Sequence, residues 1–399
     1  MNPAKHQGGA RTTILWFRRD LRLADNPALM SAVSTRGFVV PVFVFDGAGD
    51  IGRAQHGWLC ASLASLRHAL GALGFHLVVR QGTAAMALAA LARETGAERV
   101  VWTRRIEPFA TLEQEAVARA LVGQGVAIES HAPNLLFDPR AIAPASGGFY
   151  KVFGAFSKAC RRIAPAHLLP APNRNGACSG IAGLPSEPLD EPHPGDVDDA
   201  VAVGLWTPGE AGAQARLARF VENSLADYAN VRDRLDRDGT SRLSPHLAFG
   251  EVSARQVWAA AGVEKFHSEL CWREFSHHLL HHSPTLPVAN FRPAFDAFPW
   301  REDETALEAW RQGRTGYPLI DAAMRQLRAT GWMPNRARMV AASFLAKHLL
   351  IDWRAGERWF RASLVDADLA SNVVNWQWVA GSGVDAAPYF RIFNPVTQA

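Results

Sequence analysis

The first third of the chain alternates short apolar runs with longer segments in which apolar residues recur at helical spacing. The strand-like runs are residues 12–17, 39–45, 76–80 and 99–102, and the helix-like segments are 54–73, 83–93 and 112–122. This βαβ rhythm predicts an α/β domain with a doubly wound parallel sheet, similar to a Rossmann fold, over residues 11–140. Because ligands of such sheets bind beyond the carboxyl ends of the strands, residues 18–26 and 102–109 are candidate site loops.

The pattern changes after this region. Residues 165–208 are rich in Pro, Gly, Ala and acidic residues and have no helical or strand period, so we expect a connector over residues 141–209. From 210 to 399, apolar residues recur near every 3.6 positions, for example in 211–226, 254–261, 268–280 and 319–327. The sequence therefore predicts an all-α second domain. A chain of 399 residues is also longer than one hydrophobic core usually organises.

Composition narrows the class of protein only slightly. The chain has no apolar run of about 18 residues, and residues 1–10 lack the apolar centre of a signal peptide, so we expect a cytoplasmic protein. Its four cysteines are far apart and form no CxxC pair, which predicts reduced thiols and no cysteine-rich metal site. The net charge of +4 would suit a polyanionic partner, but a mildly basic enzyme explains it equally well.

Tryptophan is enriched: eight of the 13 tryptophans lie between Trp272 and Trp378. An indole ring can pack in a core, stack on a base or carry an electron, and packing alone explains this enrichment poorly.

Two further segments carry candidate chemistry. The run 239–246, GTSRLSPH, combines backbone amides, hydroxyl groups and one arginine, which suits a diphosphate, although an ordinary capping loop has the same composition. Asp366 and Asp368 precede three amides and two indoles in residues 372–378. No GxGxxG or Walker loop occurs, which argues against a dinucleotide-binding or NTPase motif.

Six blocks that span nearly the whole chain resemble the signature blocks of the cryptochrome/DNA photolyase family. They read LWFRRDLRLADNPAL, GTSRLSPHLAFGEVS, ELCWREF, GRTGYPLIDAAMRQL, NRARMVAASFLAKHLLIDWR and NWQWVAGSGVDAAPYFRIFNP. The resemblance is greatest to photolyases that repair cyclobutane pyrimidine dimers. It implies an antenna domain, a helical domain that holds a U-shaped FAD, and repair by an electron from the excited, reduced flavin. It also implies further helices after Asn394 and Pro395.

The same resemblance implies the residues that contact FAD. They are Tyr228, Thr240, Ser241, Arg242, Leu243, Ser244, Phe266, Arg338, Asp366, Ala367, Asp368 and Asn372. Among them, Arg338 and Asp366 are expected to form an ion pair beside the isoalloxazine, and Asn372 is expected to face the flavin N5. The residues that match the family's electron-carrying tryptophan chain, from flavin to surface, are Trp376, Trp353 and Trp300.

The expected partner is DNA that contains pyrimidine dimers. A dimer inside a duplex cannot meet the flavin unless it leaves the base stack, so a pocket must receive it by base flipping. The positions that match this pocket are Glu269, Trp272, Asn335, Met339 and Trp378. The positions that match contacts with the DNA backbone are Arg232, Arg273, Arg336 and Gln398. Arginine at such positions makes DNA affinity depend on salt.

The substrate and the antenna chromophore leave alternatives open. Pro334 and Asn335 do not supply the histidine pair that enzymes for (6-4) photoproducts use, so a cyclobutane dimer is the expected substrate. The antenna domains of relatives hold methenyltetrahydrofolate or 8-hydroxy-deazaflavin, and residues 104–109 match neither chromophore decisively. An empty antenna domain is a third alternative.

Two other functions and one other kind of site are compatible with parts of the sequence. A cryptochrome-type blue-light photoreceptor without repair activity is the main alternative function, and an adenylyl-transferring enzyme is a third. His277, His278, His281 and His282 form i, i+4 pairs but lack an HExxH glutamate, so we expect a solvated or hydrogen-bonded histidine face and no metal. No obligatory protein partner is evident, which predicts a monomer.

Overall fold

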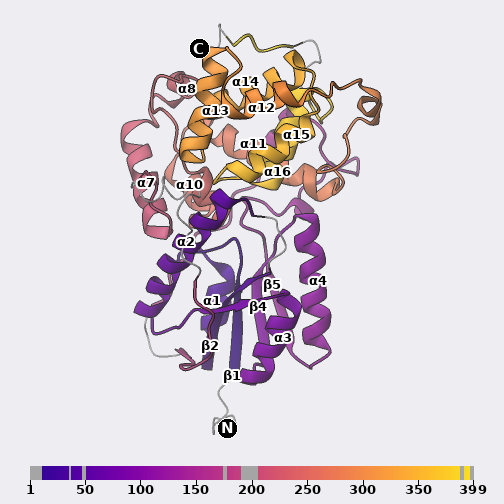
Figure 1. Ribbon diagram of the computed structural model, residues 1–399. Coiled ribbons are helices and arrows are strands. Elements are labelled where there is room, and N and C mark those ends of the chain that lie inside the picture. Colours follow the sequence, from indigo (N-terminus) through magenta and orange to yellow (C-terminus); the bar gives the residue numbers. More distant parts are fainter. Residues whose placement is uncertain are drawn as a thin grey trace.

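The computed structural model describes residues 11–35, 37–46, 51–173, 178–189, 205–386 and 391–395. An α/β region formed by the first part of the chain lies against a helical region formed by the second part (Figure 1). The predicted combination of a doubly wound parallel sheet and an all-α domain is therefore confirmed. None of the described helices combines the length and apolar character needed to cross a membrane.

The sheet is parallel, with the strand order β3-β2-β1-β4-β5. The strands are β1 (Arg11–Phe17), β2 (Gly37–Phe45), β3 (Val78–Gln81), β4 (Arg99–Thr103) and β5 (Ala127–His131). The first four match the predicted apolar runs. The last was not predicted, because it lies at the edge of the sheet and its side chains are exposed or half-buried, so it lacks the apolar run of an inner strand.

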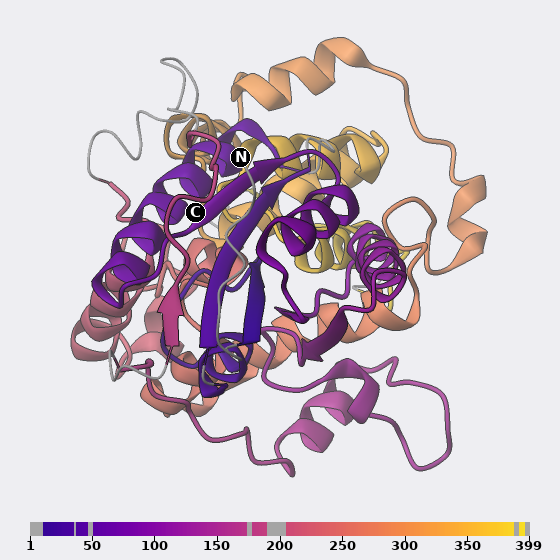
Figure 2. The same ribbon diagram turned by 90° about the horizontal axis from the view of Figure 1, so that it is seen from below.

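Helices cover both faces of the sheet, as Figure 2 shows from below. They are α1 (Pro27–Ser34), α2 (Arg53–Ala72), α3 (Ala84–Thr95) and α4 (Pro108–Val122). Alternate residues of β1 enter two separate cores, because side chains of a strand point to opposite faces. Leu15 and Phe17 pack with α1 and α2, whereas Ile14 and Trp16 pack with α3 and α4. Of these helices, α1 was not predicted; Asn26 caps it by accepting a hydrogen bond from the Leu29 amide at 3.0 Å.

The connector is more structured than the sequence indicated. It contains α5 (Phe153–Cys160), which packs on the helical domain through Phe156 and Phe275, whose rings lie 5.2 Å apart. It also contains the short strand β6 (Cys178–Gly180), which pairs with the start of β2. Three residues are too few to show a strand period, and the eight residues of α5 form barely two helical turns, so neither element was predicted from the sequence.

The helical domain has one central pair of helices, α11 and α16, with the others around them (Figure 1). The helices are α7 (Glu210–Asn223), α8 (Tyr228–Val231), α9 (Ser244–Phe249), α10 (Ala254–Ala260), α11 (Glu264–His282), α12 (Glu304–Gln312), α13 (Pro318–Thr330), α14 (Asn335–Ser343), α15 (Trp353–Ser363) and α16 (Leu369–Ala380). Four of them, α7, α10, α11 and α13, match the predicted helical segments.

Buried polar contacts join the two domains. Asp25, in the loop after β1, is fully buried and pairs with Arg255 at 2.8 Å. Gln55 of α2 donates a hydrogen bond to the carbonyl of Ala367 at 2.7 Å, beside the two predicted flavin carboxylates. Gly52 lies so close to Ala362 that a Cβ atom would come within 2.4 Å of its carbonyl oxygen. These contacts place the carboxyl ends of the strands directly against the helical domain.

Candidate functional site

A cavity of about 290 Å³ lies within the helical domain, between the 240–244 loop and helices α8, α11, α14 and α16. All of the expected FAD contacts line it: Tyr228, Thr240, Ser241, Arg242, Leu243, Ser244, Phe266, Arg338, Asp366, Ala367, Asp368 and Asn372. The fold thus brings together positions that are far apart in the sequence. Their role as FAD contacts remains a prediction.

The 240–244 loop has the features of a phosphate-binding segment. Arg242 adopts φ 50°, a left-handed conformation that costs a residue with a Cβ atom about 1–2 kcal/mol. Ser241 accepts a hydrogen bond from the Leu243 amide at 3.3 Å, and Ser244 accepts one from the Trp332 indole at 3.2 Å. Such strained loops are frequent at ligand sites, where the ligand helps to hold the backbone.

Arg338 and Asp366 form the expected ion pair at the cavity wall. The guanidinium donates to Asp366 Oδ2 at 2.7 Å, and the Asp366 side chain is 1% exposed. Its second oxygen, Oδ1, is buried and has no hydrogen-bond partner among the described residues. A buried acceptor without a donor costs about 1–3 kcal/mol, so a donor in the cavity, from a ligand or a water, would stabilise this atom. A planar N–H group, such as the one on an isoalloxazine ring, fits this requirement.

Asn372 is held in a defined orientation on α16. Its Nδ2 donates to the Glu357 carboxylate at 3.0 Å and to the Glu357 carbonyl at 3.1 Å. Its Oδ1 has no hydrogen bond to the described residues and is the atom available to a ligand. Glu357, which is 3% exposed, was not predicted as part of the site. Glu357 lies on α15 whereas Asn372 lies on α16, and no sequence motif marks the two as partners.

Two of the three predicted chain tryptophans are buried and the third is partly exposed, and their role as an electron relay remains a prediction. Trp376 lines the cavity, Trp353 is fully buried, and Trp300 is partly exposed near the start of α12. The Trp353 indole donates to the Asn290 side chain at 2.9 Å. Gly356 lets the Trp376 ring approach α15, because a Cβ atom there would lie 2.1 Å from the ring.

The predicted dimer-binding residues divide into two groups. Arg232, Glu269, Asn335 and Met339 line the mouth of the same cavity. Glu269 pairs with Arg232 and lies 3.3 Å from Lys265, so its carboxylate is already neutralised.

Trp272 and Trp378, the two predicted stacking residues, are not among the residues that line the cavity. Trp272 instead stacks on Phe153 with ring centroids 3.6 Å apart, and Trp378 lies 6.5 Å from Phe393. Helix α5, which supplies Phe153, was not predicted, so this contact could not be anticipated from the sequence.

The predicted DNA-backbone contacts also differ from one another. Arg336 is 22% exposed and pairs with Asp233 at 2.6 Å. Arg232 is only 12% exposed and pairs with Glu269. Arg273, which we expected to face DNA, is only 16% exposed and bonds to Glu274 and to the Asn134 carbonyl inside the protein. Its position does not support a phosphate contact, because these buried acceptors already use the guanidinium. Gln398 lies outside the described residues.

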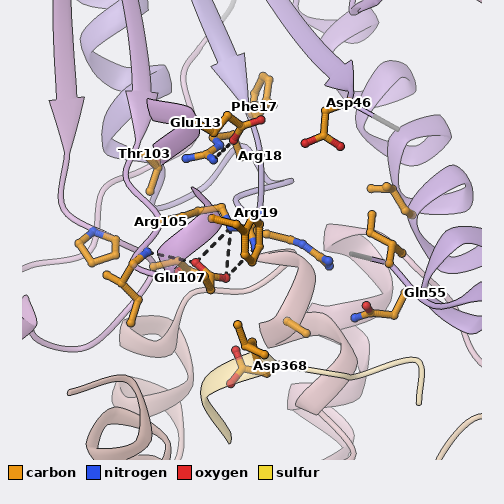
Figure 3. Close-up of a pocket in the computed structure, with 18 of the residues that line it drawn as sticks. Phe17, Arg18, Arg19, Asp46, Gln55, Thr103, Arg105, Glu107, Glu113 and Asp368 are labelled. Atoms are coloured by element: carbon orange, nitrogen blue, oxygen red, sulfur yellow. Dashed lines mark hydrogen bonds and ion pairs between the residues drawn. The ribbon is translucent and has the colours of Figure 1, made fainter. Parts of the chain in front are cut away.

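A second, larger cavity of about 560 Å³ lies between the two domains. It is at the carboxyl ends of β1, β2 and β4, as predicted for a ligand site of such a sheet. Residues from both predicted loops line it, including Arg18, Arg19, Arg105 and Glu107. Figure 3 shows these side chains between the sheet above and Asp368 of the helical domain below.

The charged groups of this interdomain cavity are paired with one another. Arg18 bonds to Glu113, and Arg105 bonds to Glu107 at 2.7 Å. Burial disfavours ionisation of Glu107, but the Arg105 guanidinium outweighs burial and lowers the pKa of Glu107 to about 2. Burial, and next the charge of Arg105, lower the pKa of Arg18 to about 10. Glu107 and Arg18 are therefore charged at neutral pH. Burial raises the pKa of Glu113 above its ordinary value.

The two cavities share one wall. Leu247, Arg273, Ala367, Asp368 and Asn372 line both of them. A ligand in the interdomain cavity would therefore lie next to a ligand in the helical cavity, with one layer of side chains between them.

A doubly wound α/β domain and a helical domain, with one cavity between them and a second cavity inside the helical domain, define a class of two-domain proteins with two adjacent candidate ligand sites. Family models described as DNA photolyase and as FAD binding domain of DNA photolyase match residues 13–173 and 266–399. The chain belongs to the DNA photolyase family.

Individual relatives agree with this assignment. A deoxyribodipyrimidine photo-lyase of Agrobacterium fabrum is 45% identical over 96% of this chain and 83% of that protein. Cryptochrome-2 of Arabidopsis thaliana is 35% identical over 97% of this chain and 68% of that protein. The crystal structure of a bacterial class III photolyase from Agrobacterium tumefaciens matches with a TM-score of 0.93 and 43% identity, covering 100% of this chain and 85% of that one.

Proposed function

We propose that this protein is a deoxyribodipyrimidine photo-lyase, which uses FAD and blue light to split cyclobutane pyrimidine dimers in DNA. The observation that carries this proposal is the helical cavity, where every expected FAD contact converges around the unpartnered Asp366 Oδ1. When bound in this cavity and fully reduced, FAD would supply the electron for opening of the cyclobutane ring.

The residues of the cavity orient the cofactor. Asp366, fixed by Arg338, accepts a hydrogen bond from the ring system, and Asn372, fixed by Glu357, presents its Oδ1 to the ring. Hydroxyl and amide groups of the 240–244 loop bind the diphosphate. Buried side chains such as Phe266 and Trp376 exclude water from the ring.

The mouth of the cavity receives the flipped dimer. Glu269 and Asn335 offer a carboxylate and an amide to the base edges, and Met339 offers an apolar contact. Arg336, which is partly exposed, is the proposed contact to a DNA phosphate. Arg232 pairs with Glu269 and holds that carboxylate in place. Each phosphate contact of this kind adds about one unit to the salt dependence of binding.

The interdomain cavity is the proposed antenna site. Its aromatic and arginine side chains, including Phe17, Phe109 and Arg19, suit a planar anionic chromophore, either methenyltetrahydrofolate or 8-hydroxy-deazaflavin. The shared wall keeps such a chromophore close to the flavin, which favours transfer of excitation energy. We also propose that the protein acts as a monomer in the cytoplasm.

Repair of a defined thymine-dimer oligonucleotide by purified, chemically reduced protein tests the function. We expect a flavin absorption spectrum and loss of dimers under blue light but not in the dark. Bound flavin without repair would instead support the cryptochrome alternative. The presence of Glu269, Asn335 and Met339 at the cavity mouth favours repair, because a photoreceptor does not require a dimer pocket.

A further inference from the structure

His277 is a buried histidine in the wall between the two cavities. It lies on α11, its side chain is 7% exposed, and it lines the interdomain cavity. Its Nε2 lies 3.1 Å from Oδ2 of Asp368, which lines both cavities and caps α16. The sequence pattern had indicated a solvated or hydrogen-bonded histidine face. A solvated state is wrong for His277 and His278, which are 6% and 1% exposed.

The hydrogen bonds of His277 define its protonation state. Its Nδ1 lies 2.9 Å from the Arg273 carbonyl, which can only accept, so Nδ1 carries a hydrogen. Its Nε2 faces the Asp368 carboxylate, whose other oxygen accepts a hydrogen bond from the Ser371 amide at 2.7 Å. An unprotonated Nε2 would place two acceptors against each other. A proton must therefore lie between Nε2 and Oδ2, and the surrounding charges place it on His277.

The surrounding charges agree with this state. Burial disfavours the imidazolium, but Asp368 outweighs burial and raises the pKa of His277 above its ordinary value. Burial likewise opposes ionisation of Asp368, and His277 outweighs it and holds the pKa of Asp368 well below the usual range. The other charged groups near this pair are Arg273 and Glu274 on α11, and Glu107 with its partner Arg105 from the α/β domain.

Asp368 connects His277 to the flavin site. Its carbonyl accepts a hydrogen bond from the Asn372 amide at 2.8 Å in the first turn of α16, and Asp366 lies two residues before it. If His277 lost its proton, the partly exposed Asp368 carboxylate would face an acceptor at 3.1 Å. Repulsion between them would displace Asp368 and with it the start of α16, which carries Asn372.

We propose that the His277 imidazolium is a positioning residue for the flavin site, which holds Asp368 and the first turn of α16 in place, and whose deprotonation weakens FAD binding. The inference rests on the proposed function, because it requires FAD in the helical cavity. The pKa of His277 is higher in the folded state than its ordinary value of 6.5. The stabilisation that the imidazolium gives to the folded site is therefore complete below pH 6.5 and is lost as the pH rises through the folded pKa. The loss therefore falls above the ordinary value of 6.5.

Two variants separate charge from shape. His277→Gln keeps one hydrogen-bond donor but cannot be cationic, and His277→Arg is cationic at every working pH. His281→Gln, one turn further along the same helix, is the matched control. The dissociation constant of FAD is measured by equilibrium dialysis in the dark between about pH 6 and about pH 9, with circular dichroism at each pH to monitor folding.

We expect wild type and His281→Gln to bind FAD about tenfold more weakly at the alkaline end of this range. His277→Gln should bind about tenfold more weakly than wild type at the acidic end and show no further change with pH. His277→Arg should bind as wild type does at the acidic end and retain that affinity at the alkaline end.

Identical pH profiles for wild type and His277→Gln would overturn the inference while leaving the proposed function intact. If His277→Gln does not fold, wild type is compared with His277→Arg. An equal loss of FAD affinity in these two proteins at alkaline pH would also overturn the inference. Absence of FAD binding by folded wild type at every pH would overturn the proposed function itself.

Discussion

The two cavities differ in how far the protein alone satisfies their polar groups. In the interdomain cavity, Arg105 pairs with Glu107, and Arg18 pairs with Glu113. Among the described residues, Asp366 Oδ1 of the helical cavity is buried without a hydrogen-bond partner, and so are Thr103 Oγ1 and Asn134 Nδ2 of the interdomain cavity. An unpartnered carboxylate oxygen costs more free energy than an unpartnered hydroxyl or amide group. We therefore expect the helical cavity to depend more strongly on its ligand than the interdomain cavity does.

The largest effect is expected for Asp366→Ala. The change leaves the partly buried Arg338 without its carboxylate and removes the ligand-facing acceptor, so FAD affinity should fall about 100-fold, equivalent to about 3 kcal/mol. FAD retained after dialysis measures the effect. Glu98→Gln, which breaks an exposed ion pair with Arg11, is the control and should change nothing. If Asp366→Ala retains FAD after dialysis, the helical cavity does not depend on its ligand through the Asp366 carboxylate, and the two cavities do not differ in this respect.

Trp376→Phe should come next. The variant keeps an aromatic ring against Gly356 but is much harder to oxidise, so photoreduction of oxidised FAD should slow by about tenfold or more. Repair by chemically reduced protein should be nearly unchanged. The rate is measured by flavin absorbance under steady blue light. Trp378→Phe, on the same helix but outside the cavity, is the control, and equal rates in all three proteins would exclude Trp376 as the electron relay.

Glu269→Ala tests the mouth of the helical cavity. The carboxylate is expected to face the dimer, so affinity for dimer-containing DNA should fall about five- to tenfold, or about 1 kcal/mol. The flavin spectrum should stay the same. Glu264→Ala, an exposed acidic residue at the start of the same helix, is the control in a DNA-binding titration at constant salt. Unaltered affinity in Glu269→Ala would show that the dimer binds elsewhere.

The smallest effect on repair is expected from the interdomain cavity. Glu107→Gln removes a buried carboxylate from Arg105 and should lower the free energy of unfolding by about 1–3 kcal/mol. Repair under direct excitation of the flavin should change less than twofold, because the shared wall remains in place. Denaturant unfolding and the repair assay measure these two quantities. A large loss of repair with intact folding would mean that the interdomain cavity is part of the catalytic site.

Hydrophobic periodicity predicted the inner elements of the fold but not its margins. Strands β1, β2 and β4 are buried on both faces and therefore read as continuous apolar runs. Strand β5 and helix α5 lie at the edges, where solvent or a neighbouring element replaces part of the apolar pattern. The position of α5 also affects the candidate site. Phe153 of α5 stacks on Trp272, which does not line the helical cavity.

The sequence by itself determined the fold class, through the periods of its apolar residues, and the candidate FAD contacts, through a resemblance carried by contiguous motifs. Only the tertiary structure decided which of these residues share a cavity, why Arg273 faces the interior, and why His277 is an imidazolium. These properties depend on burial and on partners such as Asn134, Glu274 and Asp368, which other elements bring into place. A side chain's charge state follows from its desolvation and its neighbours, and a linear pattern contains neither.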